Sequence, residues 1–152
     1  MKGMNPQNDQ KTIQNGGRVR DRKRVCLYYS ADERTDREAF ARMHEGITEL
    51  INNTAGWKYE KLYVDHPGEH EAFEDMMRDC SQGNINVIVT KSIWRFSGDI
   101  TENFRVIDRL AGMDPPVEII FTDEALFSSD VEKLKKYREF ALEIKGYEEK
   151  VE

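Results

Sequence analysis

The sequence has no run of 18 or more apolar residues, and its first residues are polar where a secretion signal needs an apolar segment. We therefore expect neither a membrane-spanning helix nor a membrane partner. Cysteine is scarce as well: Cys26 and Cys80 are the only two in 152 residues and lie far apart, so no disulfide framework is expected. The chain is long enough to bury a core without disulfides or metals, which predicts one soluble domain located in the reducing cytoplasm.

Positive charge is scarce outside the N-terminus. The net charge is −6, yet residues 1–24 carry seven Lys and Arg against two Asp, a net +5, which leaves −11 for residues 25–152. Residues 1–23 hold few large apolar groups and are expected to form a disordered basic tail. The cluster Arg18, Arg20, Arg22, Lys23 and Arg24 is a candidate phosphate-binding arm, with Arg18 and Arg20 as candidate DNA contacts. The alternative is that this basic segment is only solvated and binds no phosphate. Because cationic contacts supply most nucleic-acid affinity, the acidic body is expected to bind DNA weakly or indirectly.

Short apolar runs alternate with longer segments of helical period, which predicts an α/β fold: three layers, with a small, mostly parallel sheet and helices on both faces. Leu27 and Ile88 are expected to be buried, in adjacent, parallel, central strands. The four predicted strands are Val25–Tyr29, Trp57–Val64, Ile85–Thr90 and Val117–Phe121.

Four apolar stripes at helical spacing predict four helices. The first three are expected to face the core, and the last to belong to an amphipathic helix that lies on the domain or on a second subunit. The stripes are Phe40, Met43, Ile47, Leu50 and Ile51; Phe73, Met76, Met77 and Cys80; Ile100, Phe104, Ile107 and Leu110; and Val131, Leu134, Tyr137, Ala141 and Ile144.

The segment from Lys91 to Asp99, KSIWRFSGD, follows a predicted strand and resembles the serine-recombinase motif K-S-[IL]-S-R-[LF]-[SA]-R-[ND] at seven of nine positions. Further matches surround the other three predicted strands, so the resemblance covers about residues 24–130. The sequence is therefore similar to the N-terminal catalytic domain of serine recombinases of the resolvase/invertase family, in particular the large, transposon-type enzymes. This resemblance implies a resolvase-like domain over residues 24–152.

The resemblance also indicates an active site that has degenerated. Members of the family attack a DNA phosphodiester with a serine at the end of the first strand, without a metal or other cofactor, and surround the phosphate with arginines. Where the family has Y-x-R-x-S, this chain has Ser30 at the arginine position and Asp32 at the nucleophile position. His70 and Gly98 stand at two further arginine positions. Of the usual set Arg95 remains, and together with Lys91 it is a candidate DNA contact.

Other readings of these residues stay open. Ser30 is a possible nucleophile displaced by two residues, which keeps the same face of a strand. A phosphoacceptor receiver domain is disfavoured because Lys91 and Ser92 stand where its acceptor aspartate belongs. A metal site at Asp65, His66, His70 and Cys80 lacks a recognisable ligand spacing. Trp94 belongs either to the core or to a surface that binds a partner, and Arg95 either to a structural ion pair or to a residual anion site.

We therefore expect a serine-recombinase-like domain that is catalytically inactive. It would act by protein contact in DNA recombination or on a mobile element, with itself or with an active recombinase as partner. A divergent strand-exchange enzyme that forms a phosphoserine intermediate is the alternative. The family's DNA-binding region has no room before Glu152, so the chain is expected to be either a truncated piece or a complete small protein.

Overall fold

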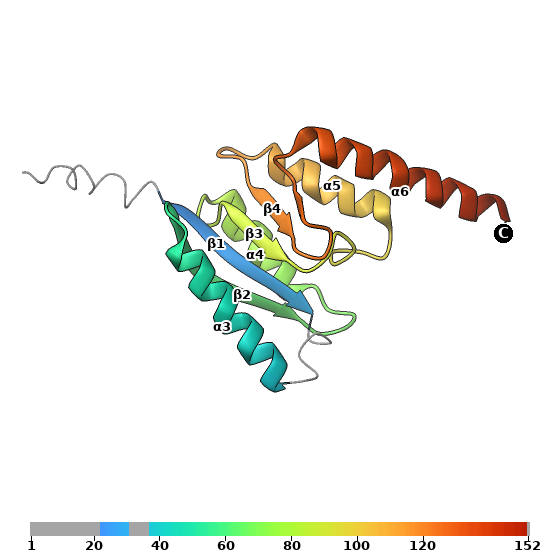
Figure 1. Cartoon of the computed structure of the whole chain (residues 1–152). Helices are drawn as coiled ribbons and strands as arrows, with labels where there is room; N and C mark the ends of the chain where they lie inside the picture. The colour runs from blue at the N-terminus through green and yellow to red at the C-terminus, as the bar shows by residue number, and fades with distance from the viewer. Residues whose placement is uncertain (1–21, 31–36, 152) are drawn as a thin grey trace, which may run out of the picture.

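The computed structural model describes residues 22–30 and 37–151, with side chains up to Gly146. Nine elements follow one another along the chain (Figure 1). They are β1 (Lys23–Ser30), α3 (Arg37–Asn53), β2 (Trp57–Asp65), α4 (Glu71–Ser81), β3 (Val87–Thr90), α5 (Ile100–Ala111), β4 (Glu118–Phe121), β5 (Leu126–Phe127) and α6 (Val131–Val151). Arg18, Arg20 and Asp32 lie outside the described residues.

The five strands form one sheet in the order β2-β1-β3-β4-β5. β1 is parallel to both of its neighbours, β2 and β3, and β3 is parallel to β4. The expected adjacency of the first and third predicted strands is thus confirmed, and Leu27 and Ile88 are both fully buried. β3 is buried at all four positions, as a central parallel strand covered on both faces should be.

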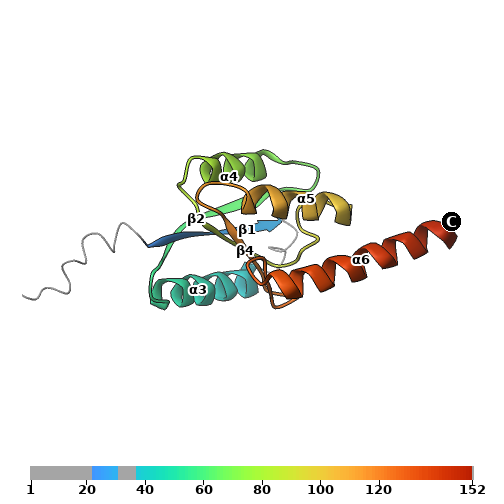
Figure 2. The same ribbon diagram turned by 90° about the horizontal axis from the view of Figure 1, so that it is seen from above.

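Helices cover both faces of the sheet, which confirms the three-layer α/β fold. α3 packs on one face, where Phe40, Ile47 and Ile51 contact the buried side chains of β1 and β3. α4 and α5 cover the other face, with a larger core around Met76, Phe104 and Ile88 (Figure 2). α6 runs beside α5 and contacts β5 at the edge of the sheet. No helix of the described chain is long and apolar enough to cross a membrane.

Some boundaries and some core positions differ from the prediction. β5, antiparallel to β4, was not expected, because two residues are too short a strand to show a period. β1 begins at Lys23, one residue before the expected start of the domain, and β3 begins at Val87 although Ile85 is already buried. The prediction that all of the first helical stripe is core is wrong: Met43 and Leu50 are exposed, because a helix packed on one face of a sheet buries a narrower stripe than the five apolar positions span.

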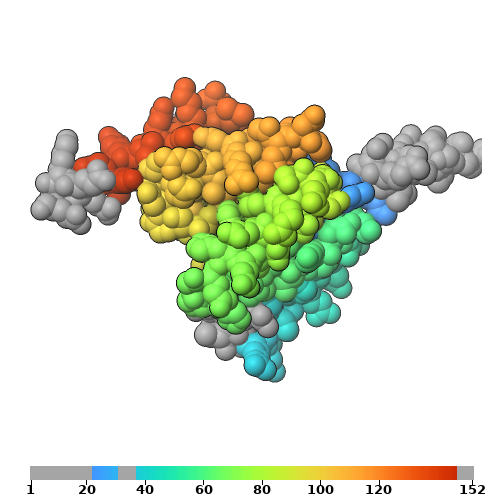
Figure 3. Space-filling view, turned by 180° about the vertical axis from the view of Figure 1, so that it is seen from behind, coloured from blue at the N-terminus to red at the C-terminus, as the bar shows by residue number. Residues whose placement is uncertain are grey.

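The last predicted stripe is divided between core and surface. Leu134, Tyr137 and Ala141 pack against the core of the α4 and α5 face, whereas Val131 and Ile144 are exposed. α6 has 21 residues, which corresponds to a length of about 32 Å. Its second half extends past the rest of the domain, as Figures 1 and 3 show.

Candidate functional site

The carboxyl ends of the parallel strands gather the residues singled out by sequence at one edge of the sheet. Ser30 is the last residue of β1 and is in register with Asp65, the last residue of β2. Thr90 ends β3, and its hydroxyl donates to the carbonyl of Tyr28 at 2.8 Å. Lys91 follows at once with an exposed side chain. In open parallel sheets ligands bind at this edge, so the fold places the predicted residues where a site belongs.

Asp65 organises the entry to α4. It is 6% exposed, and its Oδ1 accepts the Ala72 N–H at 2.8 Å while Oδ2 accepts the Phe73 N–H at 2.9 Å. Oδ2 also accepts the hydroxyl of Tyr28 at 2.7 Å. His70 occupies the N-cap position of α4 but makes no side-chain capping bond. Asp65 therefore satisfies the free N–H groups at the start of the helix and leaves the imidazole of His70 to the surface.

His70 and Gly98, predicted independently as altered arginine positions, lie at one pocket of about 340 Å³. Phe73 and Phe96 form its apolar part, with ring centroids 5.4 Å apart. The only carboxylate among its lining residues is that of Glu102, which is paired with Arg105 at 2.6 Å. No Arg or Lys lines this pocket, so its described residues offer no permanent positive charge to a phosphate.

The segment from Lys91 to Asp99 forms a loop before α5 rather than the first turn of the helix. Glu124, in the turn between β4 and β5, fixes its start: it accepts the Ser92 hydroxyl at 2.8 Å and the Ile93 N–H at 3.1 Å. Ile93 is fully buried. The loop is thus held by packing and by the Glu124 carboxylate, and the sequence did not predict this contact.

The end of the same loop is fixed by Asp99, the N-cap of α5, whose Oδ1 accepts the Thr101 N–H at 3.0 Å. Lys145 of α6 donates to the same oxygen at 3.1 Å. The hydrogen bond from Lys145, and then that from Thr101, lower the pKa of Asp99 below its ordinary value. The carboxylate at the last position of the motif therefore joins α5 to α6.

Trp94 and Arg95 occupy the middle of the loop. Trp94 is 47% exposed and lies beside Tyr137 of α6. The structure therefore places Trp94 at the surface and not in the core, and its role in binding a partner stays a prediction. Arg95 is half-buried, and its backbone N–H donates to the Ser92 carbonyl at 3.0 Å.

The hypothetical metal ligands do not meet. Cys80 is buried in the core, and burial, followed by the charge of Asp79, raises the pKa of its thiol to about 12. Asp65 is committed to Tyr28 and to the start of α4. In the part of the chain that the structure describes, no three His, Cys, Asp or Glu side chains are grouped so as to hold a metal ion.

No protein-family model matches the sequence, and no curated protein is significantly similar to it. Among solved structures, the fold is similar to that of the N-terminal catalytic domain of TP901-1 integrase, with a TM-score of 0.60 and 15% sequence identity. The match covers 86% of this chain and 99% of the integrase domain. At this identity the likeness shows a shared fold, the mostly parallel α/β fold of a serine-integrase catalytic domain.

Proposed function

We propose that this chain is a serine-recombinase-like domain that does not cut DNA and acts by protein contact in DNA recombination or on a mobile element. The integrase-like fold supports the family context. The pocket at His70 and Gly98 supports the loss of activity, since neither Arg nor Lys is among the described residues that line it. A phosphoryl-transfer site that works without a metal needs cations around the reacting phosphate. Acidic Asp32 at the nucleophile position would repel that phosphate further.

An exposed apolar strip on α6 is the observation that carries the proposed protein contact. Phe140 is 61% exposed and Ile144 is 43% exposed, and residues four positions apart lie on the same side of a helix. Tyr137, three positions before Phe140, continues the strip toward Trp94 of the motif loop, which lies beside it. Clusters of exposed aromatic and aliphatic side chains such as this one are typical of interfaces.

The charges of α6 favour a second copy of the same chain as the partner. The exposed cation Lys136 lies one turn before Phe140, and the exposed anion Glu143 lies beside Ile144. Two copies of α6 packed antiparallel around the shared strip would bring Lys136 of each helix toward Glu143 of the other. Such a two-fold arrangement uses the same patch on both subunits.

Light scattering during gel filtration at tens of micromolar tests this contact. The full chain is expected to elute as a dimer, and the double variant Phe140→Ser with Ile144→Ser as a folded monomer. Leu50→Ser is the matched control, because Leu50 is a 68% exposed leucine on α3, and it is expected to leave the dimer intact. A monomeric wild-type chain, or a dimer that survives the double variant, would contradict the proposal. Deleting α6 is a poorer test, since Leu134, Tyr137 and Ala141 complete the core.

A further inference from the structure

A second pocket lies at the opposite end of the sheet, where the strands begin. It has a volume of about 420 Å³ and is formed by Arg22, Lys23 and Arg24 before and at the start of β1, by Gly83 and Asn86 before β3, and by Pro115 and Pro116 before β4. β1 runs from Lys23 to Ser30, and eight residues of strand span roughly 26 Å. The pocket is therefore separate from the site at Ser30, His70 and Gly98.

Three cations line this pocket, and none of them has an anionic partner among the described residues. None of the residues that line it is acidic, and no ion pair of Arg22, Lys23 or Arg24 occurs within the described part of the chain. The Nε of Arg22 is buried, and none of the described residues accepts its proton. Three like charges at one pocket repel one another, and a buried N–H without an acceptor is unfavourable. A bound anion would relieve both.

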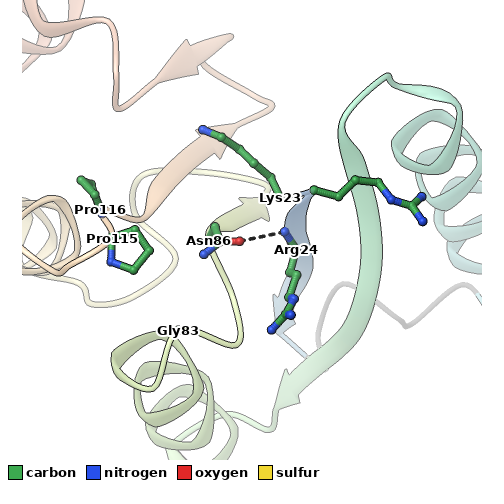
Figure 4. A pocket seen from close by; sticks show the side chains of 7 residues that line it. Lys23, Arg24, Gly83, Asn86, Pro115 and Pro116 are labelled. Atoms are coloured by element: carbon green, nitrogen blue, oxygen red, sulfur yellow. Dashed lines mark hydrogen bonds between the residues drawn. The ribbon is translucent and has the colours of Figure 1, made fainter. Parts of the chain in front are cut away.

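Asn86 adds an oriented donor to the cations. Its Oδ1 accepts the backbone N–H of Arg24 at 2.9 Å, and its own backbone N–H donates to the Arg24 carbonyl at 2.9 Å. The side-chain oxygen is thereby fixed, which leaves the amide NH₂ to point into the pocket (Figure 4). An anion held here would accept from this amide as well as from the arginines, whose planar guanidinium groups match the oxygens of a phosphate.

Pro115 and Pro116 form a wall without charge or N–H donors on the side facing Lys23 and Arg24 (Figure 4). Pockets of this size accommodate a small molecule rather than an ion alone. The rest of the domain argues against a polymer, because the −11 charge of residues 25–152 would repel a polyanion wherever it left the pocket. A compact ligand with one phosphate and an uncharged, partly apolar body would contact only the cations and the two prolines. It would therefore avoid the acidic surface of the rest of the domain.

We propose that this pocket binds a small phosphate ester of about the size of a nucleoside monophosphate. The phosphate lies against Lys23, Arg24 and the amide of Asn86, and the uncharged part lies against the two prolines. This site does not depend on α6 or on the absence of DNA cleavage, so it stands or falls separately from the proposed function.

Calorimetric titration of the full chain with adenosine monophosphate tests the site, with adenosine, inorganic phosphate and a short duplex of random sequence titrated in parallel. Adenosine monophosphate is expected to bind, inorganic phosphate to bind more weakly, and adenosine not to bind. Arg24→Gln and Lys23→Gln are each expected to weaken binding roughly 10- to 100-fold, because each variant removes one charge-assisted hydrogen bond to the phosphate. Arg42→Gln is the matched control, because it removes an exposed cation of α3, and it is expected to leave the affinity unchanged.

Asn86→Asp is the sharpest variant. It keeps an oxygen that accepts the Arg24 N–H and replaces only the amide NH₂ by a carboxylate oxygen beside three cations. Binding is expected to be lost while the unliganded protein melts at the same or a higher temperature, which distinguishes a lost ligand contact from a damaged fold. The proposal would be refuted if adenosine monophosphate failed to bind, or if it bound no more tightly than inorganic phosphate. It would also be refuted if Arg24→Gln and Asn86→Asp bound adenosine monophosphate as tightly as the wild type does. Duplex DNA that binds more tightly and displaces adenosine monophosphate would assign the pocket to a polymer and would equally overturn the proposal.

Discussion

The hydroxyl of Tyr28 lies 2.7 Å from Oδ2 of Asp65, so a buried side chain of β1 is bonded to the last residue of β2. The same carboxylate accepts two backbone N–H groups at the start of α4. One residue therefore couples two strands and a helix directly beside the pocket at His70. Because Asp65 ends β2 and accepts the N–H groups of Ala72 and Phe73, it sets where the first turn of α4 meets the rest of the site.

Asp65→Ala is expected to lower the free energy of unfolding by about 3 kcal/mol, because it leaves three buried donors without their acceptor. Tyr28→Phe, which removes only one of these bonds, should cost about 1 kcal/mol. Urea denaturation measures both. Glu71→Ala is the matched control, since it removes an exposed carboxylate from the first turn of the same helix and is expected to cost only a few tenths of a kcal/mol, or ~0.5 at most. An Asp65→Ala protein as stable as the control would show that the carboxylate does not hold the three elements together.

The contact between Asp99 and Lys145 should make stability sensitive to acid. The pKa of Asp99 is lower in the folded protein than in the unfolded chain, first because Lys145 donates to it and then because Thr101 does. Its contribution is therefore complete above the unfolded pKa, near 3.9, and is lost as the pH falls through the lower folded pKa. Lys145→Gln is expected to raise the pKa of Asp99 toward the ordinary value, as measured by carboxyl NMR titration. Lys135→Gln removes an exposed cation from the same helix, and an equal rise of the Asp99 pKa in that variant would contradict the specific contact.

Glu124 is expected to control the order of the motif loop. Glu124→Ala removes the acceptor of the Ser92 hydroxyl and the Ile93 N–H, which should cost about 1–3 kcal/mol. Amide exchange at Ile93 should become faster, and the fluorescence of the neighbouring Trp94 should change. Asp123→Asn alters an adjacent exposed carboxylate whose residue contacts Lys91 only through its backbone N–H. Unchanged protection of Ile93 in Glu124→Ala would rule out this role.

Much of the fold was predictable because its signals are local. The burial of β1 and β3 follows from uninterrupted apolar runs, and their parallel direction follows from the helices α3 and α4 that alternate with the strands along the chain. β5 has only two residues, which is too short for the alternation of buried and exposed side chains that identifies a strand in a sequence. On α6 the apolar spacing located the helix, but it did not separate Leu134, which packs against the core, from Ile144, which is exposed. That division depends on how far the neighbouring elements extend along α6.

The candidate site was predictable only as separate residues. Family spacing singled out His70 and Gly98, but their shared pocket depends on how α4 and the motif loop fold. Lys145 lies 46 positions from Asp99, and no local pattern connects them. The pocket at the start of β1 was also beyond sequence reasoning, since Arg24, Asn86 and Pro115 come together only when three strands lie side by side.

The last prediction concerns cleavage: the purified protein is expected neither to cut supercoiled DNA nor to form a covalent adduct with it. Ser30, the serine nearest to the expected nucleophile position, ends β1 at the family's arginine position, and the nucleophile position itself is Asp32. Restoring a serine with Asp32→Ser is expected to fail as well, because His70 and Gly98 still stand where arginines are needed. Each missing cationic donor typically costs about 10²–10³ in rate, and these losses act on the same phosphate.

Denaturing gels of the protein incubated with labelled DNA would reveal an adduct. The combined variant Asp32→Ser, His70→Arg and Gly98→Arg is the informative comparison, because it restores the nucleophile together with two of the missing charges. Adduct formation by this variant, and not by Asp32→Ser alone, would assign the inactivity to the lost cations rather than to the fold. An adduct formed by the unaltered chain and abolished by Ser30→Ala would instead establish the alternative, an active strand-exchange enzyme with a displaced nucleophile, since only a serine that attacks phosphorus would leave that covalent record.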